Sequence, residues 1–304
     1  MKKTRCIIAL VAAMFAVGAM LFVACQKEDE RCVNQESKTS ATFTIPLDRG
    51  EIDVLTKEIG IAHNYTVFAL YNSPDVEGMN ASDLCQYIHN FFIDNGEDMG
   101  LKMLPDCMSA IDDVGDKDEL YACIGEMIEN GNMEWDFPDA VDAELIMNSV
   151  EEYYDFVEDA FLNSDTYDEF ETACLDRLKE LCESTTTIED YFYMSAGCNI
   201  TLSSFCAWVA VFSGFDNSKG LLKDAVEFLR NGFKAIKKAV SEMLEPLRNI
   251  VHADLEGGFW GGSVGLFGSA AAAVVSSGGV AIGVFAGCWC VGATVSSIVY
   301  AENH

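Results

Sequence analysis

Residues 257–301 read GGFWGGSVGLFGSAAAAVVSSGGVAIGVFAGCWCVGATVSSIVYA, a run of 45 residues without a charged side chain between Glu256 and Glu302. Two sets of three glycines stand four residues apart in this run. They are Gly257, Gly261 and Gly265, followed by Gly279, Gly283 and Gly287. Residues four apart fall on nearly one face of an α-helix, so each set predicts a smooth strip on which another helix packs closely.

A turn is predicted between the two sets, at Ser276-Ser277-Gly278-Gly279. We therefore expect two helices folded back on each other, at about Phe259–Val275 and Val280–Tyr300, that pack through their glycine strips. At about 1.5 Å per residue they span roughly 25 and 32 Å, close to the ~30 Å core of a bilayer. Residues 257–301 are thus predicted to be a glycine-zipper hairpin.

Acidic side chains are concentrated in the middle of the chain. From Asp75 to Asp190 there are 33 Asp and Glu residues against four Lys and Arg, and the 304-residue chain has a formal net charge of −30. The electrostatic field of this negative charge repels nucleic acid and anionic lipid. The middle segment is therefore expected to face water and to bind no nucleic acid.

Helical patterns dominate after residue 75, with apolar stripes beneath acidic faces. Residues 76–215 are predicted to form an acidic helical domain. Its uncharged stretch Phe192–Phe215 is interrupted by polar residues, which favours a buried core helix over a membrane span.

A short β element is expected before this domain, in residues 41–75. Apolar and polar residues alternate from Ala41 to Leu47, and Thr66–Tyr71 is a second candidate strand. The predicted fold class is therefore mainly α: an acidic helical bundle with a short N-terminal β element and a C-terminal Gly/Ala-rich apolar helical hairpin.

Residues 216–256 are predicted to form an amphipathic heptad helix, which Pro246 should kink. Its apolar seam consists of Leu222, Val226, Leu229, Phe233, Ile236, Val240, Met243, Leu247 and Ile250. Because the outward face is basic, two interpretations stay open. The seam packs on the bundle while Lys and Arg contact the acidic domain, or the helix lies on a membrane surface.

The first 24 residues have the pattern of a signal peptide, with a basic start and an apolar run from Cys6 to Ala24. The run ends at Leu21-Phe22-Val23-Ala24-Cys25, which resembles a bacterial lipobox. The following Gln26-Lys27-Glu28-Asp29-Glu30 resembles the export signal of Bacteroidota surface lipoproteins. The resemblance implies lipidation of Cys25, a lipidated tether at 25–40 and a surface-exposed place on the outer membrane. An uncleaved membrane anchor is the alternative.

Ten cysteines remain once Cys6 and Cys25 are set aside, and an even number in an exported protein suggests disulfides. Two pairs are spaced by eight residues, Cys174 with Cys182 and Cys198 with Cys206. In an antiparallel helical hairpin centred near Asp190, Cys174 lies opposite Cys206 and Cys182 opposite Cys198. Such twin pairs resemble small disulfide-stapled helical proteins. Buried free thiols are one alternative, and a four-thiolate metal site is disfavoured by its spacing.

Catalytic patterns are absent from the sequence. The histidines His63, His89, His252 and His304 are scattered, and no Gly-x-Ser-x-Gly, P-loop, dinucleotide fingerprint or His-Glu-x-x-His occurs. We therefore predict a protein that is not an enzyme and that has no metal site and no cofactor.

Small residues make up most of the C-terminal stretch, where 25 of the 45 are Gly, Ala or Ser. Small residues let membrane helices associate. Glycine strips in a late apolar hairpin resemble two-peptide bacteriocins and, more loosely, the hydrophobic hairpin of pore-forming colicins. The resemblance implies a toxin-like or oligomer-forming element, with a membrane and further copies of the chain as partners. The alternative is a non-catalytic binding or structural envelope lipoprotein whose hairpin is a buried core.

Overall fold

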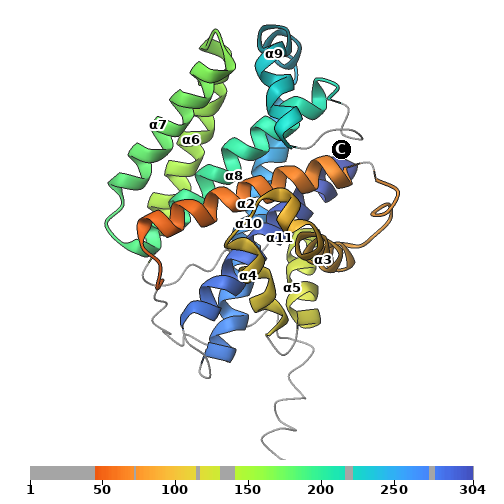
Figure 1. The fold of residues 1–304 in the computed structure, drawn as a ribbon, viewed down its shortest axis with the longest axis vertical. Coiled ribbons are helices and arrows are strands. Elements are labelled where there is room, and N and C mark those ends of the chain that lie inside the picture. The colour runs from red at the N-terminus through yellow and green to blue at the C-terminus, as the bar shows by residue number, and fades with distance from the viewer. Residues whose placement is uncertain are drawn as a thin grey trace, which may run out of the picture. The chain divides into compact units, whose positions relative to one another are not determined.

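The computed structural model describes residues 45–71, 73–113, 117–130, 141–215, 222–273 and 278–303, all within one compact unit. These residues form ten α-helices and no β-strand, so the mainly α class is confirmed (Figure 1). The helices are α2 (Arg49–Leu70), α3 (Ala81–Met99), α4 (Leu104–Asp112), α5 (Lys117–Asn130), α6 (Ala143–Asn163), α7 (Tyr167–Ser184), α8 (Ile188–Phe212), α9 (Leu222–Val240), α10 (Leu244–Ala273) and α11 (Gly278–Asn303).

The second candidate strand, Thr66–Tyr71, is wrong, because these residues are the last turn and the C-cap of α2. The first candidate, from Ala41 to Leu47, lies mostly outside the described residues, and its described part is not a strand. A capping box starts α2: the Glu51 backbone N–H donates to Asp48 Oδ1, and the Asp48 N–H donates to Glu51 Oε2, both at 2.9 Å. This local signal outweighs the strand propensity of Thr66, Val67 and Phe68 further along the helix.

The N-termini of four other helices are capped by a side chain of the preceding residue: Asn80 for α3, Asp142 for α6, Thr166 for α7 and Thr187 for α8. Helix α4 has no such local cap. Instead, the buried Glu58 of α2 accepts hydrogen bonds from the backbone N–H groups of Lys102, Met103 and Leu104, at 2.9, 2.8 and 2.9 Å. A carboxylate at a helix N-terminus satisfies free N–H groups and favours the helix dipole, so Glu58 ties α4 to α2.

Helices α10 and α11 form a hairpin inside the bundle (Figure 1). Helix α11 contacts α2, α3, α4 and α5, while α10 contacts α5 and α8. Helix α10 begins at Leu244, so it crosses the boundary expected between residues 256 and 257 without a break. The predicted turn lies largely outside the described residues.

The heptad segment consists of two helices rather than one, because α9 ends at Val240 and α10 begins at Leu244. Pro246 stands in the first turn of α10, where its missing N–H breaks no intrahelical hydrogen bond. Pro246 therefore marks a helix start and not the expected kink. The described seam is buried on both sides of the break, at Leu229, Phe233, Ile236, Val240, Leu247 and Ile250.

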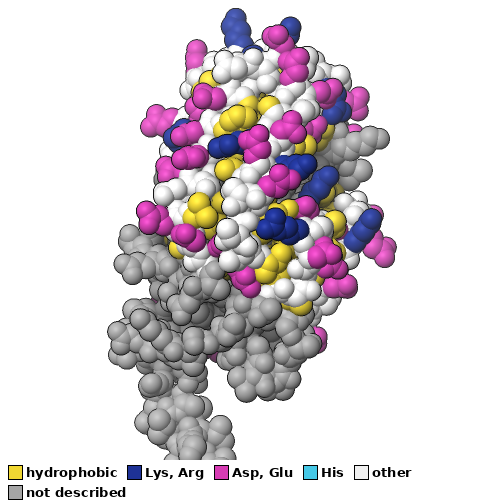
Figure 2. All heavy atoms as spheres, turned by 90° about the vertical axis from the view of Figure 1, so that its left-hand side faces the viewer, with side chains coloured by type: hydrophobic (Ala, Val, Ile, Leu, Met, Phe, Trp, Pro, Cys, Tyr) yellow, Lys and Arg dark blue, Asp and Glu magenta, His cyan; other side chains and the backbone are white. Residues whose placement is uncertain are grey.

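Basic side chains beside the seam contact the acidic helices α6 and α7. Arg230 Nε donates to Asp168 Oδ1 at 2.7 Å, and Arg248 Nη2 donates to Asp155 Oδ1 at 2.6 Å. Figure 2 shows Lys and Arg interspersed among Asp and Glu on the side where α6 and α7 lie in Figure 1. The buried seam and these ion pairs agree with the first of the two interpretations, in which the segment packs on the bundle.

Candidate functional site: a buried apolar hairpin

The first glycine strip lies directly against α11. A Cβ added to Gly261 would overlap the carbonyl oxygen of Cys288 and stand 2.9 Å from its carbonyl carbon. The strip has the same relation to α11 along its length: Gly257 lies against Gly292 and Ser296, and Gly265 against Val284 and Cys288. The two backbones are in contact, which only glycine permits here.

The strip on α11 that receives these glycines is Val284, Cys288, Gly292 and Ser296, again with a spacing of four. Sequence reasoning missed it because, on this second helix, only glycines at that spacing were considered. Small side chains such as Cys and Ser serve the same purpose, so a search for small residues at this spacing would have found the strip.

The second predicted strip faces α4 instead of α10. A Cβ on Gly283 would stand 3.0 Å from Ala110 Cβ, and a Cβ on Gly287 would stand 2.7 Å from Ile111 Cδ1. The expectation that the two glycine strips pack on each other is therefore corrected. Successive residues turn by about 100° around a helix, so Gly287 and its neighbour Cys288 serve two different contacts. The packing around Gly279, at the start of α11, lies outside what the structure describes.

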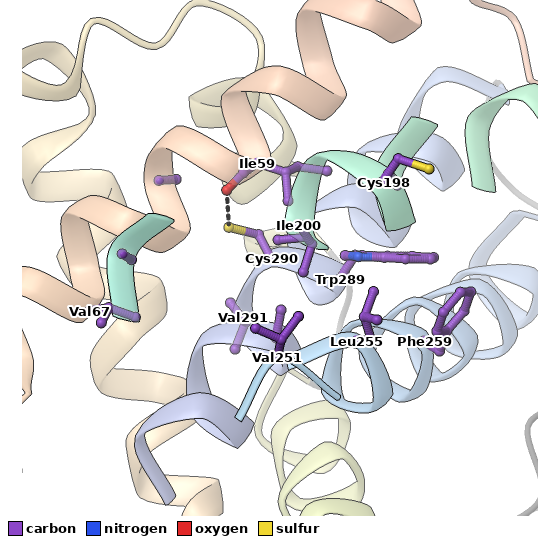
Figure 3. Close-up of a cluster of buried hydrophobic side chains, with 14 of the residues drawn as sticks. Ile59, Val67, Cys198, Ile200, Val251, Leu255, Phe259, Trp289, Cys290 and Val291 are labelled. Carbon is purple, nitrogen blue, oxygen red and sulfur yellow. Dashed lines mark hydrogen bonds between the residues drawn. The ribbon is translucent and has the colours of Figure 1, made fainter. Parts of the chain in front are cut away.

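Aromatic rings fill the space beside the glycine contact. Trp289 lies against Phe259 and Phe285, with ring centroids 4.8 and 5.4 Å apart, and Tyr193 of α8 lies 5.6 Å from Trp289. Figure 3 shows Trp289 beside Phe259 and Leu255, with Cys290 directed toward Ile59 of α2. The hairpin is thus packed on α8 and α2 by large side chains as well as by glycines.

Two described helices, α8 and the segment Ile282–Asn303 of α11, are long and apolar enough to cross a membrane. Within the most apolar window of α11, 94% of the residues are buried inside the fold, against 67% for α8. In this folded state both helices belong to the protein core, and the prediction of a buried core helix near Phe192–Phe215 agrees with the burial of α8.

A polar cluster holds α10 just before the glycine strip. Ser204 of α8 donates its hydroxyl hydrogen to Asp254 Oδ2, and His63 Nε2 of α2 lies 3.2 Å from the same oxygen. All three side chains are fully buried. In a nucleophilic triad the histidine lies between serine and carboxylate, whereas here the carboxylate lies between Ser204 and His63. The cluster therefore joins α2, α8 and α10 and does not have the order of a nucleophilic triad.

The pKa values of two histidines are shifted, one on the hairpin helix α10 and one on the neighbouring helix α3. Burial lowers the pKa of His252 on α10, although Glu151 opposes the shift. Burial also lowers the pKa of His89 on α3, whose Nε2 lies 3.3 Å from Asp112 Oδ1. The neutral imidazole is therefore the form that this fold favours at both positions.

The structure contains no disulfide among Cys174, Cys182, Cys198 and Cys206. Burial raises the pKa of Cys182 and of Cys206 to about 12. Burial also raises the pKa of Cys174 and Cys198, and the next largest causes are the nearby Cys206 and Cys182 respectively. The two disulfides Cys174–Cys206 and Cys182–Cys198 remain a prediction.

Cys25 and the signal sequence lie outside the described residues. Within the described residues, no group of three or more His, Cys, Asp or Glu side chains is arranged to hold a metal ion. Comparisons of the chain with protein-family models, with curated proteins and with solved structures found no match.

Proposed function

We propose that this chain is a lipid-anchored surface protein whose acidic helical bundle holds a membrane-active hairpin in a water-soluble state. The observation that carries the proposal is the enclosure of α11, a helix long and apolar enough to span a bilayer yet 94% buried over its most apolar window. The lipobox-like sequence ending at Cys25 supports a place at the cell surface. The acidic residues on the helices around the hairpin, called the cover below, support a water-soluble state of the protein.

The two glycine strips have different consequences if the hairpin leaves the bundle. The contact of Gly257, Gly261 and Gly265 with α11 is internal to the hairpin, so it persists in a membrane. The strip of Gly283 and Gly287 faces α4 and becomes free when the cover opens. A freed small-residue strip is a contact for a helix of a second copy, which gives the released hairpin a route to oligomers.

The alternative function is a non-catalytic binding or structural envelope lipoprotein. It is favoured by the same packing of Gly283 and Gly287 on α4, because this strip is already used inside the bundle. In that case the hairpin is a permanent core and has no membrane-bound state.

A reversible cross-link between α4 and α11 separates the two functions. The Cβ positions of Ala110 and Gly283 are 3.0 Å apart, close to the ~3.8 Å of a disulfide, so Ala110→Cys with Gly283→Cys should bridge after a small shift. Dye release from lipid vesicles should be lost when the bridge is oxidised and return on reduction, with each single variant as control. A protein that never releases dye, bridged or reduced, has only a core hairpin.

A further inference from the structure

The side chain of Asp254 occupies an unusual place on the hairpin. The other acidic residues of α10, Glu245 and Glu256, are exposed, whereas Asp254 is fully buried one turn before Gly257. A buried carboxylate requires partners, because removal from water costs several kcal/mol for an unpaired charge.

The two side chains that contact Asp254 come from α8 and α2, the helices that pack on the hairpin. Ser204 donates to Oδ2, and His63 Nε2 lies 3.2 Å from the same oxygen. The other ring nitrogen of His63, Nδ1, lies 3.1 Å from Asn64 Oδ1. The other carboxylate oxygen of Asp254, Oδ1, has no hydrogen-bond partner among the described residues. The buried carboxylate therefore depends on one hydroxyl and one imidazole.

We infer that the contact of His63 and Ser204 with Asp254 is an autoinhibitory lock that keeps the hairpin inside the bundle. This inference rests on the proposed function and names how the release is controlled. In a released hairpin, Asp254 lies outside the uncharged run 257–301 and reaches water at the membrane edge. His63 and Ser204 thus offset the cost of burying Asp254, and this cost arises only in the closed state. Removing one partner leaves the carboxylate buried and unpaired, which favours release.

The test compares three variants in vesicles of phosphatidylethanolamine and phosphatidylglycerol that contain a self-quenched dye. His63→Leu should raise the rate of dye release about tenfold or more, because the buried carboxylate of Asp254 then keeps Ser204 as its one polar neighbour among the described residues. His63→Leu combined with Asp254→Leu removes the charge as well and should return the rate to that of the parent. Arg230→Gln, which breaks an exposed ion pair with Asp168, is the matched control and should leave the rate unchanged.

Circular dichroism measures the helix content of each variant, and this separates a loss of folding from a loss of the contact with Asp254. If His63→Leu loses helix content as well, recovery of both helix and parental release rate in the double variant still supports the lock. Equal release from the parent, the single and the double variant overturns the lock and leaves the proposed function intact. Release that stays high in the double variant also overturns it, because the charge then is not the cause. No release from any of them overturns the proposed function itself.

Discussion

Gly261 of α10 lies against the carbonyl group of Cys288 on α11, and a Cβ at Gly261 would stand 2.9 Å from that carbonyl carbon. The position therefore reports directly on whether the hairpin is held together by its glycines. Cys288 is itself fully buried, so a side chain added at Gly261 would meet α11 inside the core and not at the surface.

Gly261→Leu should destabilise the folded protein by about 1–3 kcal/mol, because the added carbons push α10 and α11 apart. Urea unfolding measures this change. Vesicle binding should equal that of the parent while dye release falls, since the side chain adds hydrophobicity but spoils assembly. Val264→Leu, at a partly exposed position of the same helix, is the matched control. Equal effects at both positions would show that the glycine spacing carries no structural information.

Glu58→Gln should lower the free energy of unfolding by about 1–3 kcal/mol, because a neutral amide oxygen replaces a carboxylate that accepts three backbone hydrogen bonds. Hydrogen exchange at Lys102, Met103 and Leu104 should accelerate. Glu77→Gln, at an exposed turn position, makes the same chemical change without a helix to cap. Unchanged exchange at the start of α4 would contradict the capping role of Glu58.

Acid should weaken the fold through His89 and His252, whose pKa values burial lowers from 6.5. Below pH ~6.5 the unfolded chain binds more protons than the folded one, so this stability is present above pH ~6.5 and is lost as the pH falls. The free energy of unfolding should therefore decrease from pH 7.5 to 5.5. His89→Gln should flatten this slope, and a slope equal to that of the parent would rule His89 out.

Acid should also raise membrane association, since protonation toward pH ~4 removes the mutual repulsion of the 33 acidic residues between Asp75 and Asp190. Binding to anionic vesicles that stays flat from pH 7 to 4 would count against this expectation.

The four cysteines of α7 and α8 should be found as Cys174–Cys206 and Cys182–Cys198 in protein from an oxidising compartment. Each bridge should stabilise the fold by about 2–4 kcal/mol. Peptide mapping without reductant decides the matter: free thiols or other pairings would exclude the predicted connectivity.

Cys25→Ala should abolish lipidation and leave an unprocessed chain, because the lipobox-like sequence then lacks its acceptor thiol. Mass spectrometry and membrane fractionation measure the loss. A variant with the same mass shift and the same fraction as the parent would disprove the lipoprotein assignment.

Local sequence signals predicted the hairpin and the seam from Leu229 to Ile250, since periodic apolar and small residues determine which helix face is buried. The break before Leu244 was missed, because Pro246 fits both a kink and a helix start. Helix α2 was also missed, although the capping box of Asp48 and Glu51 was present in the sequence. Thr66, Val67 and Phe68 near its end are β-branched or aromatic residues, which favour a strand.

The polar cluster was beyond sequence reasoning for a different reason. His63, Ser204 and Asp254 lie on three helices far apart in the chain, and no local pattern relates them. The partner of Gly283 was equally hidden, because the sequence shows that a face is smooth but not which helix covers it. Such pairings arise from the tertiary fold alone.

The backbone contact between α10 and α11 also has an evolutionary consequence. Gly257, Gly261 and Gly292 admit no side chain, not even that of alanine, so any substitution there disturbs both helices at once. At exposed positions of the helices around the hairpin, replacing Asp by Glu costs little stability. Moving an acidic residue to another exposed position of the same helix costs equally little. Divergent relatives of this chain should therefore be recognised by small residues at these spacings and not by the acidic surface that dominates its composition.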